Sequence, residues 1–336
     1  MTLRWLRQNW FALGLLFVLV VAFLAAPALR AADPGGVLRG TLRTSVVIVI
    51  FVVIGMILPG EEVLSGLLRV RVYLVTQLFI FAVVPLVMAV FLVVVSFLDG
   101  AGIVTPAVRV GLLALAVLPT TGSSCVVFTE TARGNTSAAT ANSTLANILG
   151  VFLSPLLLSM ILRAGVQIQP VSQVGSVLVG LLQQMILPLA VGQGIRGILR
   201  RRVTAAYVAL EPRMRDAVSA LIIAVVFLSA GGAFEGQQRL DPATTAVVLF
   251  LALFHITILA LAWLTGWLTF SERADRIALL FTGTQKTLAL GIPLLSLYFR
   301  GQPYLLAAAL GPLIFYHLWQ LMVGGLVANH LRSSRR

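Results

Sequence analysis

Ten long apolar runs follow one another along the chain, separated by short polar segments. They lie at about 10–29, 45–58, 72–97, 103–132, 136–162, 174–195, 217–233, 243–269, 277–299 and 304–327. A transmembrane helix needs about 20 mostly apolar residues to cross a hydrocarbon core of about 30 Å. Most runs reach this length, and flanking residues can extend the two short runs, the second and the seventh. The pattern predicts an all-α polytopic membrane protein with ten transmembrane helices.

Small polar residues interrupt the fourth and the ninth run. The first polar stretch, Pro119–Asn147, continues from the fourth run into the fifth, and the second is Thr282–Thr287. A polar or backbone group without a partner costs several kcal/mol in a bilayer, so each stretch is either a misassigned loop or a site. Paired interruptions in corresponding halves of a membrane chain are typical of the binding site of a secondary transporter.

The ten runs divide into two sets of five. The first set occupies residues 10–162 and the second 174–327, within a single membrane domain of residues 1–336. Because a repeat with an odd number of helices inserts its second copy upside down, we expect two inverted five-helix repeats. The interrupted runs then occupy equivalent places in the two repeats. The halves share no clear residue-level identity, so this expectation depends on the number of runs and the places of the breaks.

The composition agrees with a membrane protein and argues against other classes. Hydrophobic residues make up 59% of the 336 residues and charged residues 10%, with a mean hydropathy of +1.02, whereas a soluble domain carries about 25% charge. The runs do not alternate as the strands of a transmembrane β-barrel do. The net charge of +13 comes mostly from arginines in short loops, where they set membrane orientation and meet anionic lipid. It therefore does not indicate a nucleic-acid partner.

The distribution of basic residues predicts the orientation. Sixteen arginines lie beside the termini and the even-numbered connections, against at most seven on the other side, which places both termini in the cytoplasm. The longest connection, about Arg196 to Asp216, is expected to be an arginine-rich cytoplasmic loop. Ala25–Ala28 resembles a signal-peptidase site, so a cleaved first run is an alternative. We interpret that run as a spanning helix, since it is longer than the usual signal segment.

Two charged residues inside the runs are candidates for function. The only lysine of the chain, Lys286, lies about ten residues inside the ninth run, and Glu130 lies in the polar half of the fourth run. A charge at the centre of a bilayer costs at least about 2.5–3.5 kcal/mol, so it normally faces a cavity or a partner. Lys286 is the strongest single candidate. Glu130 is only three residues from Arg133, and an interfacial ion pair is an equal alternative for it.

Uncharged polar residues gather around the two interruptions. Pro119 frees a backbone carbonyl, and freed carbonyls with nearby hydroxyl groups would suit a small hard cation or a polar substrate group. Spacing places Asn142, Ser143 and Asn147 on one face of the fifth helix. With the two charged residues above, the candidate ion- and substrate-binding set is Gln77, Ser123, Ser124, Glu130, Asn142, Ser143, Thr282, Thr284, Gln285 and Lys286. His255, alone in the eighth run, is interpreted as a helix contact.

The sequence offers no sign of an enzyme. It contains no nucleophile–base pair with usable spacing, no P-loop and no spacing of metal ligands, and the single Cys125 excludes an internal disulfide. We therefore expect no catalytic residues and no cofactor. An intramembrane enzyme is a rival interpretation that product formation in detergent would revive.

Several motifs resemble those of a known transporter family. They include Leu118–Ser124, Ala132–Asn135 and Asn142–Gly150, which are similar to the fourth and fifth helices of the bile acid:sodium symporter superfamily, and Thr282–Pro293, which is similar to its ninth helix. The closer resemblance is to the bacterial bile-acid-symporter-like branch, which is related to vertebrate solute carrier family 10 member 7. Gln183–Gly192 and His255–Trp263 resemble its sixth and eighth helices, so the resemblance covers nearly the whole chain.

The resemblance implies an architecture and a mechanism. It implies that broken helices four and nine cross in a core domain, made of helices three to five and eight to ten, beside a panel domain made of the others. Substrate would bind between the two domains, with alternating access. In the sodium-coupled members, cations sit at the crossing, which carries over to Ser123, Ser124, Ser143 and Gln285, and more loosely to Gln77.

Two positions depart from the sodium-coupled pattern. Phe281 stands where the resemblance places a sodium-binding glutamate, and Lys286 stands where it places a neutral asparagine. Like charges about 4 Å apart repel by about 4 kcal/mol at an effective dielectric constant of about 20. We expect Lys286 to fill the place of the cation or to titrate, and a pairing with Glu130 is one hypothesis.

The sequence thus predicts a secondary active transporter of a small organic anion in the bacterial inner membrane. Sodium and protons both stay open as coupling ions, and the substrate and the oligomeric state are not determined. The alternative is a regulatory or binding membrane protein that keeps the fold and does not transport. Substrate-dependent flux discriminates between the two.

Overall fold

A computed structural model of the chain describes residues 3–33, 36–57, 70–98, 104–165, 179–180, 182–202, 204–230, 242–300 and 302–333. These residues form helices joined by short turns, and no strand occurs among them. Within them, six helices are long and apolar enough to cross a membrane: Val37–Ile57, Val70–Phe97, Thr136–Leu162, Ala243–Thr269, Arg273–Tyr298 and Tyr304–Ser333. The protein is therefore a multi-pass helical membrane protein, as the apolar runs predict.

The chain divides into two compact units, each built from segments that are distant in sequence. The first unit contains residues 1–58, 171–239 and 292–308, and the second contains 59–170, 240–291 and 309–336. Two helices, α14 (Leu288–Tyr298) and α15 (Pro303–Ser333), have residues in both units.

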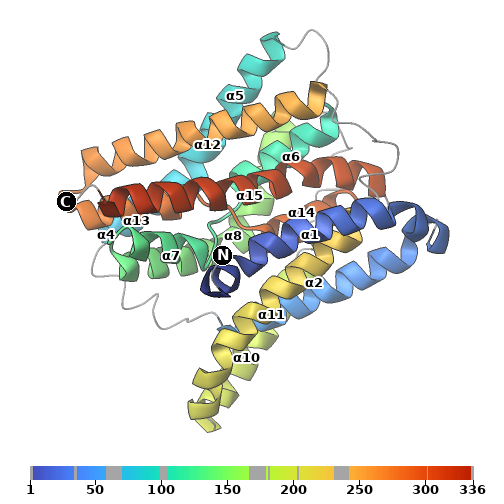
Figure 1. Ribbon diagram of the computed structural model, residues 1–336, viewed down its shortest axis with the longest axis horizontal. Coiled ribbons are helices and arrows are strands. Elements are labelled where there is room, and N and C mark those ends of the chain that lie inside the picture. Colours follow the sequence, from blue (N-terminus) through green and yellow to red (C-terminus); the bar gives the residue numbers. More distant parts are fainter. Residues whose placement is uncertain are drawn as a thin grey trace. The chain divides into compact units, whose positions relative to one another are not determined.

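The first unit is built around α2 (Val37–Ile57). It packs against α11 (Thr204–Ala230) and α10 (Leu187–Arg202), which continues from the short π-helix η4 (Leu182–Ile186). The helix α1 (Leu3–Ala32) packs against α11 (Figure 1). Where α2 and α10 cross, a Cβ atom on Gly55 or Gly192 would collide with the backbone of the other helix. Small residues allow this close approach of helix backbones, as is usual in membrane helix pairs.

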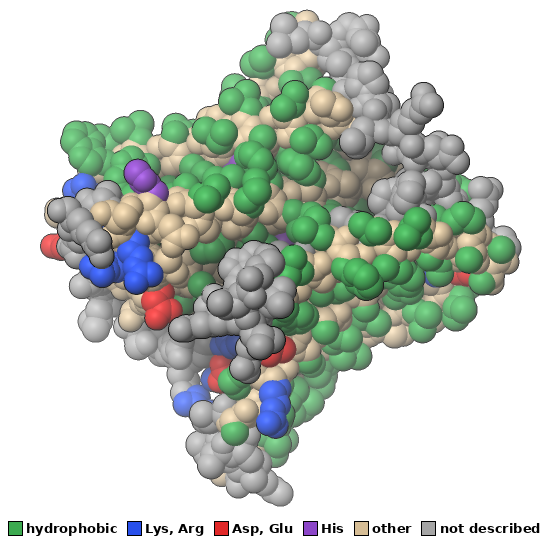
Figure 2. All heavy atoms as spheres, in the orientation of Figure 1, with side chains coloured by type: hydrophobic (Ala, Val, Ile, Leu, Met, Phe, Trp, Pro, Cys, Tyr) green, Lys and Arg blue, Asp and Glu red, His purple; other side chains and the backbone are tan. Residues whose placement is uncertain are grey.

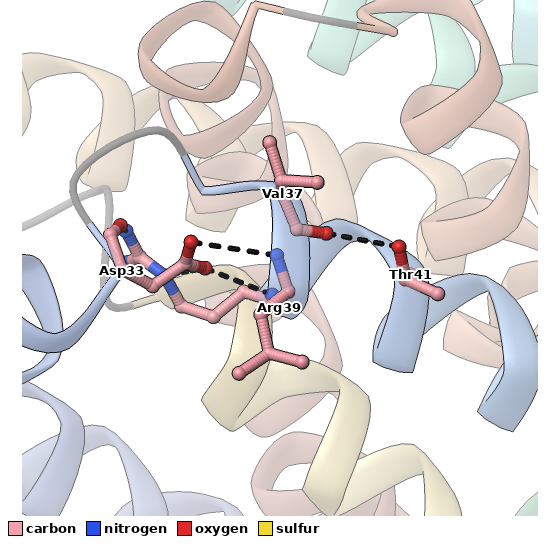
Figure 3. A network of polar contacts seen from close by, with 5 residues as sticks. Asp33, Val37, Arg39 and Thr41 are labelled. Atoms are coloured by element: carbon pink, nitrogen blue, oxygen red, sulfur yellow. Dashed lines mark hydrogen bonds and ion pairs between the residues drawn. The ribbon is translucent and has the colours of Figure 1, made fainter.

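Asp33 organises the turn between α1 and α2. Its carboxylate accepts hydrogen bonds from the backbone N–H of Arg39, at 2.9 Å, and from the Arg39 side chain, at 3.3 Å (Figure 3). These bonds lower the pKa of the Asp33 carboxyl group below its ordinary value. A carboxylate that accepts backbone N–H groups at a helix N-terminus supplies partners that the helix itself lacks. Asp33 therefore anchors the start of α2.

The structure corrects the expectation of a loop between Arg196 and Asp216. The helix α10 continues to Arg202 and α11 begins at Thr204, so this arginine-rich connection is largely helical. Arginine, alanine, leucine and glutamate are good helix formers, and an ion pair at i, i+4 joins Arg215 to Glu211 at 2.6 Å.

The second unit surrounds α13 (Arg273–Thr284). The third apolar run forms α4 (Val70–Leu78), the π-helix η2 (Phe79–Val83) and α5 (Val84–Leu98) in one continuous rod. The fourth run forms α6 (Pro106–Val117) and α7 (Ser124–Thr131), and the fifth forms α8 (Thr136–Gly165). The helix α13 packs against α4, η2, α7, α8 and α12 (Pro242–Thr269) (Figure 1). The span that contains α13 and α14 is 94% buried, which makes it the inner element.

The outer helices present apolar side chains. On α12, exposed large hydrophobic residues include Leu249, Leu253, Ile256, Leu264, Trp267 and Leu268. Green side chains cover much of the visible surface in Figure 2, whereas blue and red ones gather in a few places. Such a surface suits contact with lipid.

The bounds of several runs differ from those expected. The second run begins at Val37 rather than near Ser45, and the predicted turn at Arg133–Asn135 is confirmed, with Arg133 at φ 57°. The helix of the seventh run, α11, begins at Thr204 rather than near Ala217. The expected boundaries near 58, 103, 174 and 231–233 lie outside the described residues.

Candidate functional site

The first interruption separates α6 from α7. The helix α6 ends at Val117, Pro119 follows its C-cap residue Leu118, and helical structure resumes at Ser124. Leu118, Pro119 and Thr120 are buried, whereas Gly122 and Ser123 are exposed. The break leaves carbonyl groups of the last turn of α6 without their helical partners, because Thr120 and Gly122 lie outside a helix.

The second interruption separates α13 from α14. Residues 285–287 are not helical, and all three side chains are buried. Thr287 caps the N-terminus of α14, since its hydroxyl accepts a hydrogen bond from the backbone N–H of Ala289 at 3.2 Å. The predicted helix breaks are therefore present at both polar stretches.

The two interruptions contact each other directly. The backbone N–H of Thr287 donates to the carbonyl of Pro119 at 3.1 Å. A Cβ atom added to Gly150 of α8 would lie 2.6 Å from the Pro119 ring, and one added to Gly291 of α14 would lie 2.7 Å from Leu118. Glycines thus allow neighbouring helices to close around the place where the breaks meet.

The ammonium group of Lys286 lies among backbone carbonyls beside this contact. Its Nζ atom donates to the carbonyl oxygens of Leu118 at 2.7 Å, Ala116 at 2.9 Å and Ile80 at 3.4 Å. The side chain is only 1% exposed. Two of these carbonyls belong to the C-terminal end of α6, which carries the negative end of the helix dipole. Among the described residues, the hydrogen-bond partners of Nζ are therefore backbone carbonyls rather than carboxylates.

The helix α15 holds the backbone of Lys286. The side-chain amide of Gln320 accepts from the Lys286 N–H at 2.7 Å and donates to the Lys286 carbonyl at 2.7 Å. One ring nitrogen of His317 lies 3.2 Å from the same carbonyl, and the Tyr316 hydroxyl donates to the carbonyl of Thr284 at 2.8 Å. These side chains replace backbone bonds that the break removes.

A chain of side-chain contacts links the two interruptions. The hydroxyl of Ser124 donates to Gln285 Oε1 at 3.3 Å and lies 2.6 Å from the hydroxyl of Thr121. The amide nitrogen of Gln285 lies 3.4 Å from the carbonyl of Gln320. The structure therefore brings together Ser124, Gln285 and Lys286 of the predicted set.

A second polar contact joins α4 to α8. Gln77 donates through Nε2 to the backbone and side-chain oxygens of Asn142, both at 3.1 Å. Asn147, one helical turn beyond Ser143, donates to the carbonyl of Thr120 in the first break at 3.1 Å. Gln77 Oε1 and Thr120 Oγ1 have no hydrogen-bond partner among the described residues. Side-chain amide contacts therefore join the third, fourth and fifth apolar runs.

Other predicted residues lie apart from this arrangement. Glu130 and Ser123 are exposed, and the hydroxyl of Ser143 donates to the carbonyl of Thr140 in its own helix. Thr284 donates to Leu280, also within its helix, and the buried Thr282 hydroxyl has no partner among the described residues. The hypothesis that Lys286 pairs with Glu130 is wrong, because carbonyls take up its ammonium group and Glu130 faces outward.

Sequence reasoning missed the contribution of α15 and of Ile80 in η2. His317 and Gln320 are polar residues three positions apart in an apolar run, so their shared face was a usable signal. Ile80 carried no such signal, since it contributes only its carbonyl. The buried His255 lies edge-on to Tyr316, with ring centroids 5.1 Å apart, and behaves as a helix contact.

Comparison with known proteins identifies the family. The sequence profile of the SBF-like CPA transporter family (DUF4137) matches residues 9–333. The chain belongs to this family. The match covers both interruptions and every candidate residue of the site, so the SBF-like CPA transporter family accounts for the chain as a whole.

Named relatives of this family member are transporters. The chain is 29% identical to sodium/bile acid cotransporter 7-B of Xenopus laevis, over 98% of the chain and 94% of the relative. It is 27% identical to sodium/bile acid cotransporter 7 of Rattus norvegicus, over 97% and 93%. An uncharacterized protein of Pseudomonas aeruginosa is 30% identical over 85% of the chain and 82% of the relative. The two vertebrate relatives are named as cotransporters rather than enzymes.

Proposed function

We propose that this protein is a secondary active transporter of a small organic anion, working by alternating access in the bacterial inner membrane with both termini in the cytoplasm. Its ten helices form two inverted five-helix repeats, 10–162 and 174–327, with a core made of helices three to five and eight to ten and a panel made of the others. Membership of the SBF-like CPA transporter family supports the class of function. The named relatives support cation coupling.

One observation carries the proposal: two interrupted membrane helices meet beside a buried lysine side chain. The contact from Thr287 to the carbonyl of Pro119 joins the breaks, and Lys286 lies beside it. Interrupted helices offer ions and substrates the unpaired ends of half-helices within the membrane. Lys286 takes the place of a sodium ion here, since Phe281, where the family resemblance places a glutamate, is buried against Phe128 with ring centroids 5.7 Å apart.

The half-helix N-termini favour an anionic substrate. The helix α7 begins after the exposed residues Gly122 and Ser123, and a helix N-terminus carries partial positive charge and free N–H groups. The ammonium group of Lys286 is enclosed by carbonyls, so it contributes less directly to anion binding than the helix N-terminus does. We assign the substrate to this exposed end, with Ser123, Ser124 and Gln285 as candidate contacts. Sodium or protons are the candidate coupling ions, and they would bind at polar groups that do not contact Lys286.

Transport by the purified protein in proteoliposomes tests this function. Vesicles that contain the protein are diluted into buffers that hold one radiolabelled organic anion at a time, bile acids included, and that impose a sodium gradient, a pH gradient or neither. We expect uptake above that of protein-free vesicles for at least one anion. Absence of uptake for the whole panel, with protein that is folded and monodisperse, would favour the non-transporting regulatory protein instead.

A further inference from the structure

The three carbonyls around Lys286 are free because two prolines interrupt their helices. In η2 the backbone bonds run from residue i+5 to residue i, as the bond from Val84 to the Phe79 carbonyl shows. The next such bond would join the Ile80 carbonyl to residue 85, which is a proline and has no N–H. Pro119 ends α6 in a different way, because a proline disfavours helical dihedral angles at the preceding residue, and Leu118 has a ψ of 147°; Ala116 and Leu118 therefore lack helical donors. The free carbonyls thus come from two separate helices.

Their number and distances fit a primary ammonium group. A lysine ammonium has three N–H donors and no acceptor, and the three oxygens lie 2.7, 2.9 and 3.4 Å from Nζ. Calcium and magnesium take six or more oxygen ligands, whereas the three oxygens here equal the number of N–H donors of a primary ammonium group.

The main chain of Lys286 is fixed independently of its side chain. Gln320 bonds both its N–H and its carbonyl, and the break continues into Thr287, which bonds Pro119. Shortening the side chain therefore leaves the backbone contacts of residue 286 in place. It empties the volume between the Cβ atom and the carbonyls.

We propose that the carbonyl oxygens of Ile80, Ala116 and Leu118 form a binding site specific for primary ammonium groups. Lys286 is its tethered occupant in the native protein, and a small alkylammonium ion from solution occupies it when that side chain is shortened. This deepens the proposed function, because it assigns the cation at the crossing of the broken helices to N–H recognition rather than to sodium.

Chemical rescue of Lys286→Ala tests the proposal. The purified variant is heated in detergent with methylammonium chloride, and with equal concentrations of sodium, potassium or tetramethylammonium chloride. A ligand that binds only the folded state raises apparent stability, so we expect methylammonium to raise the Tm of the variant by about 2–4 °C at saturation. We expect no such rise for the other three salts, nor for the native protein in methylammonium.

Lys286→Met serves as the second variant, because its apolar chain fills the volume and offers no donor. A Tm well below that of the native protein, unaffected by methylammonium, supports the site. A Tm within about 1 °C of the native value would overturn it, since the carbonyls would then need no donor. The Lys286→Met experiment tests the proposal even if Lys286→Ala does not fold.

Two results with Lys286→Ala would also overturn the proposal. One is a folded variant that gains no stability from methylammonium, and the other is a gain from sodium that equals the gain from methylammonium. Because the readout is thermal stability, its failure is separate from failure of transport. Rescue of stability without flux in any vesicle assay would uphold the ammonium site and reject the transporter.

Discussion

At the scale of single residues, Gln320 holds the second helix break in place. Its amide makes two bonds of 2.7 Å to one buried peptide group, the N–H and the carbonyl of Lys286. In a β-ladder, backbone amides make paired bonds of this kind, and here a side-chain amide makes them. Because residue 286 carries the ammonium group, the position of the cation depends on this amide.

We expect Gln320→Leu to destabilise the protein strongly. The substitution leaves the buried N–H of Lys286 without a partner, at a cost of about 1–3 kcal/mol, and leaves its carbonyl only the contact with His317, so the midpoint of thermal unfolding falls by several degrees. The same substitution at the exposed Gln183 is the matched control and is expected to change little. Equal midpoints for the two variants would mean that the Gln320 amide does not support the break.

At the scale of helices, glycines set how closely α8 and α14 approach the first break. Gly150→Ala places a methyl group 2.6 Å from the rigid ring of Pro119, and overpacking of this kind costs about 1–3 kcal/mol. We expect a lower midpoint of thermal unfolding. Gly311→Ala in α15 is the control, since nothing lies within 4 Å of the added atom. That control should be neutral or stabilising, because alanine favours helix more than glycine does.

The turn from α1 to α2 should make stability depend on pH. Folding lowers the pKa of Asp33 through its bonds to Arg39, so the stabilisation is present above the ordinary aspartate pKa of about 3.9 and is lost as pH falls through the lower folded value. We expect Asp33→Asn to be less stable than the native protein at pH 7. The difference in midpoint should shrink below about pH 4; a constant difference would contradict the carboxylate's role.

The helices could be predicted from the sequence wherever the length of an apolar run decides that a segment spans the membrane. Both breaks were visible in the sequence, because Pro119 and the polar residues around Gln285 disagree with an uninterrupted span. The helical connection near Arg202 was not predicted. Its arginines affect both membrane orientation and helix formation, but only their helix propensity decides the local structure. The partners of Lys286 were hidden as well, because backbone carbonyls leave no mark on the sequence.

At the scale of the whole molecule, the cation in the second compact unit is part of the chain. We therefore expect the native protein to show the same midpoint of thermal unfolding in sodium chloride and in potassium chloride. A ligand at a hundredfold excess over Kd adds about 2.7 kcal/mol, so a sodium site would be readily seen. A sodium-specific rise would show that a cation site exists apart from Lys286 and would support sodium symport.

Pro85 and Pro119 also limit which substitutions the chain can accept at position 286. With both prolines present, an apolar residue at 286 leaves three oxygens facing apolar side chains. If Pro85 were replaced first, the restored N–H would compete with the ammonium for the Ile80 carbonyl. A route by single changes between a lysine-filled and an ion-filled crossing therefore passes through a less stable intermediate whether position 85 or position 286 changes first. An engineer who wishes to restore ion dependence should therefore exchange Pro85 and Lys286 together.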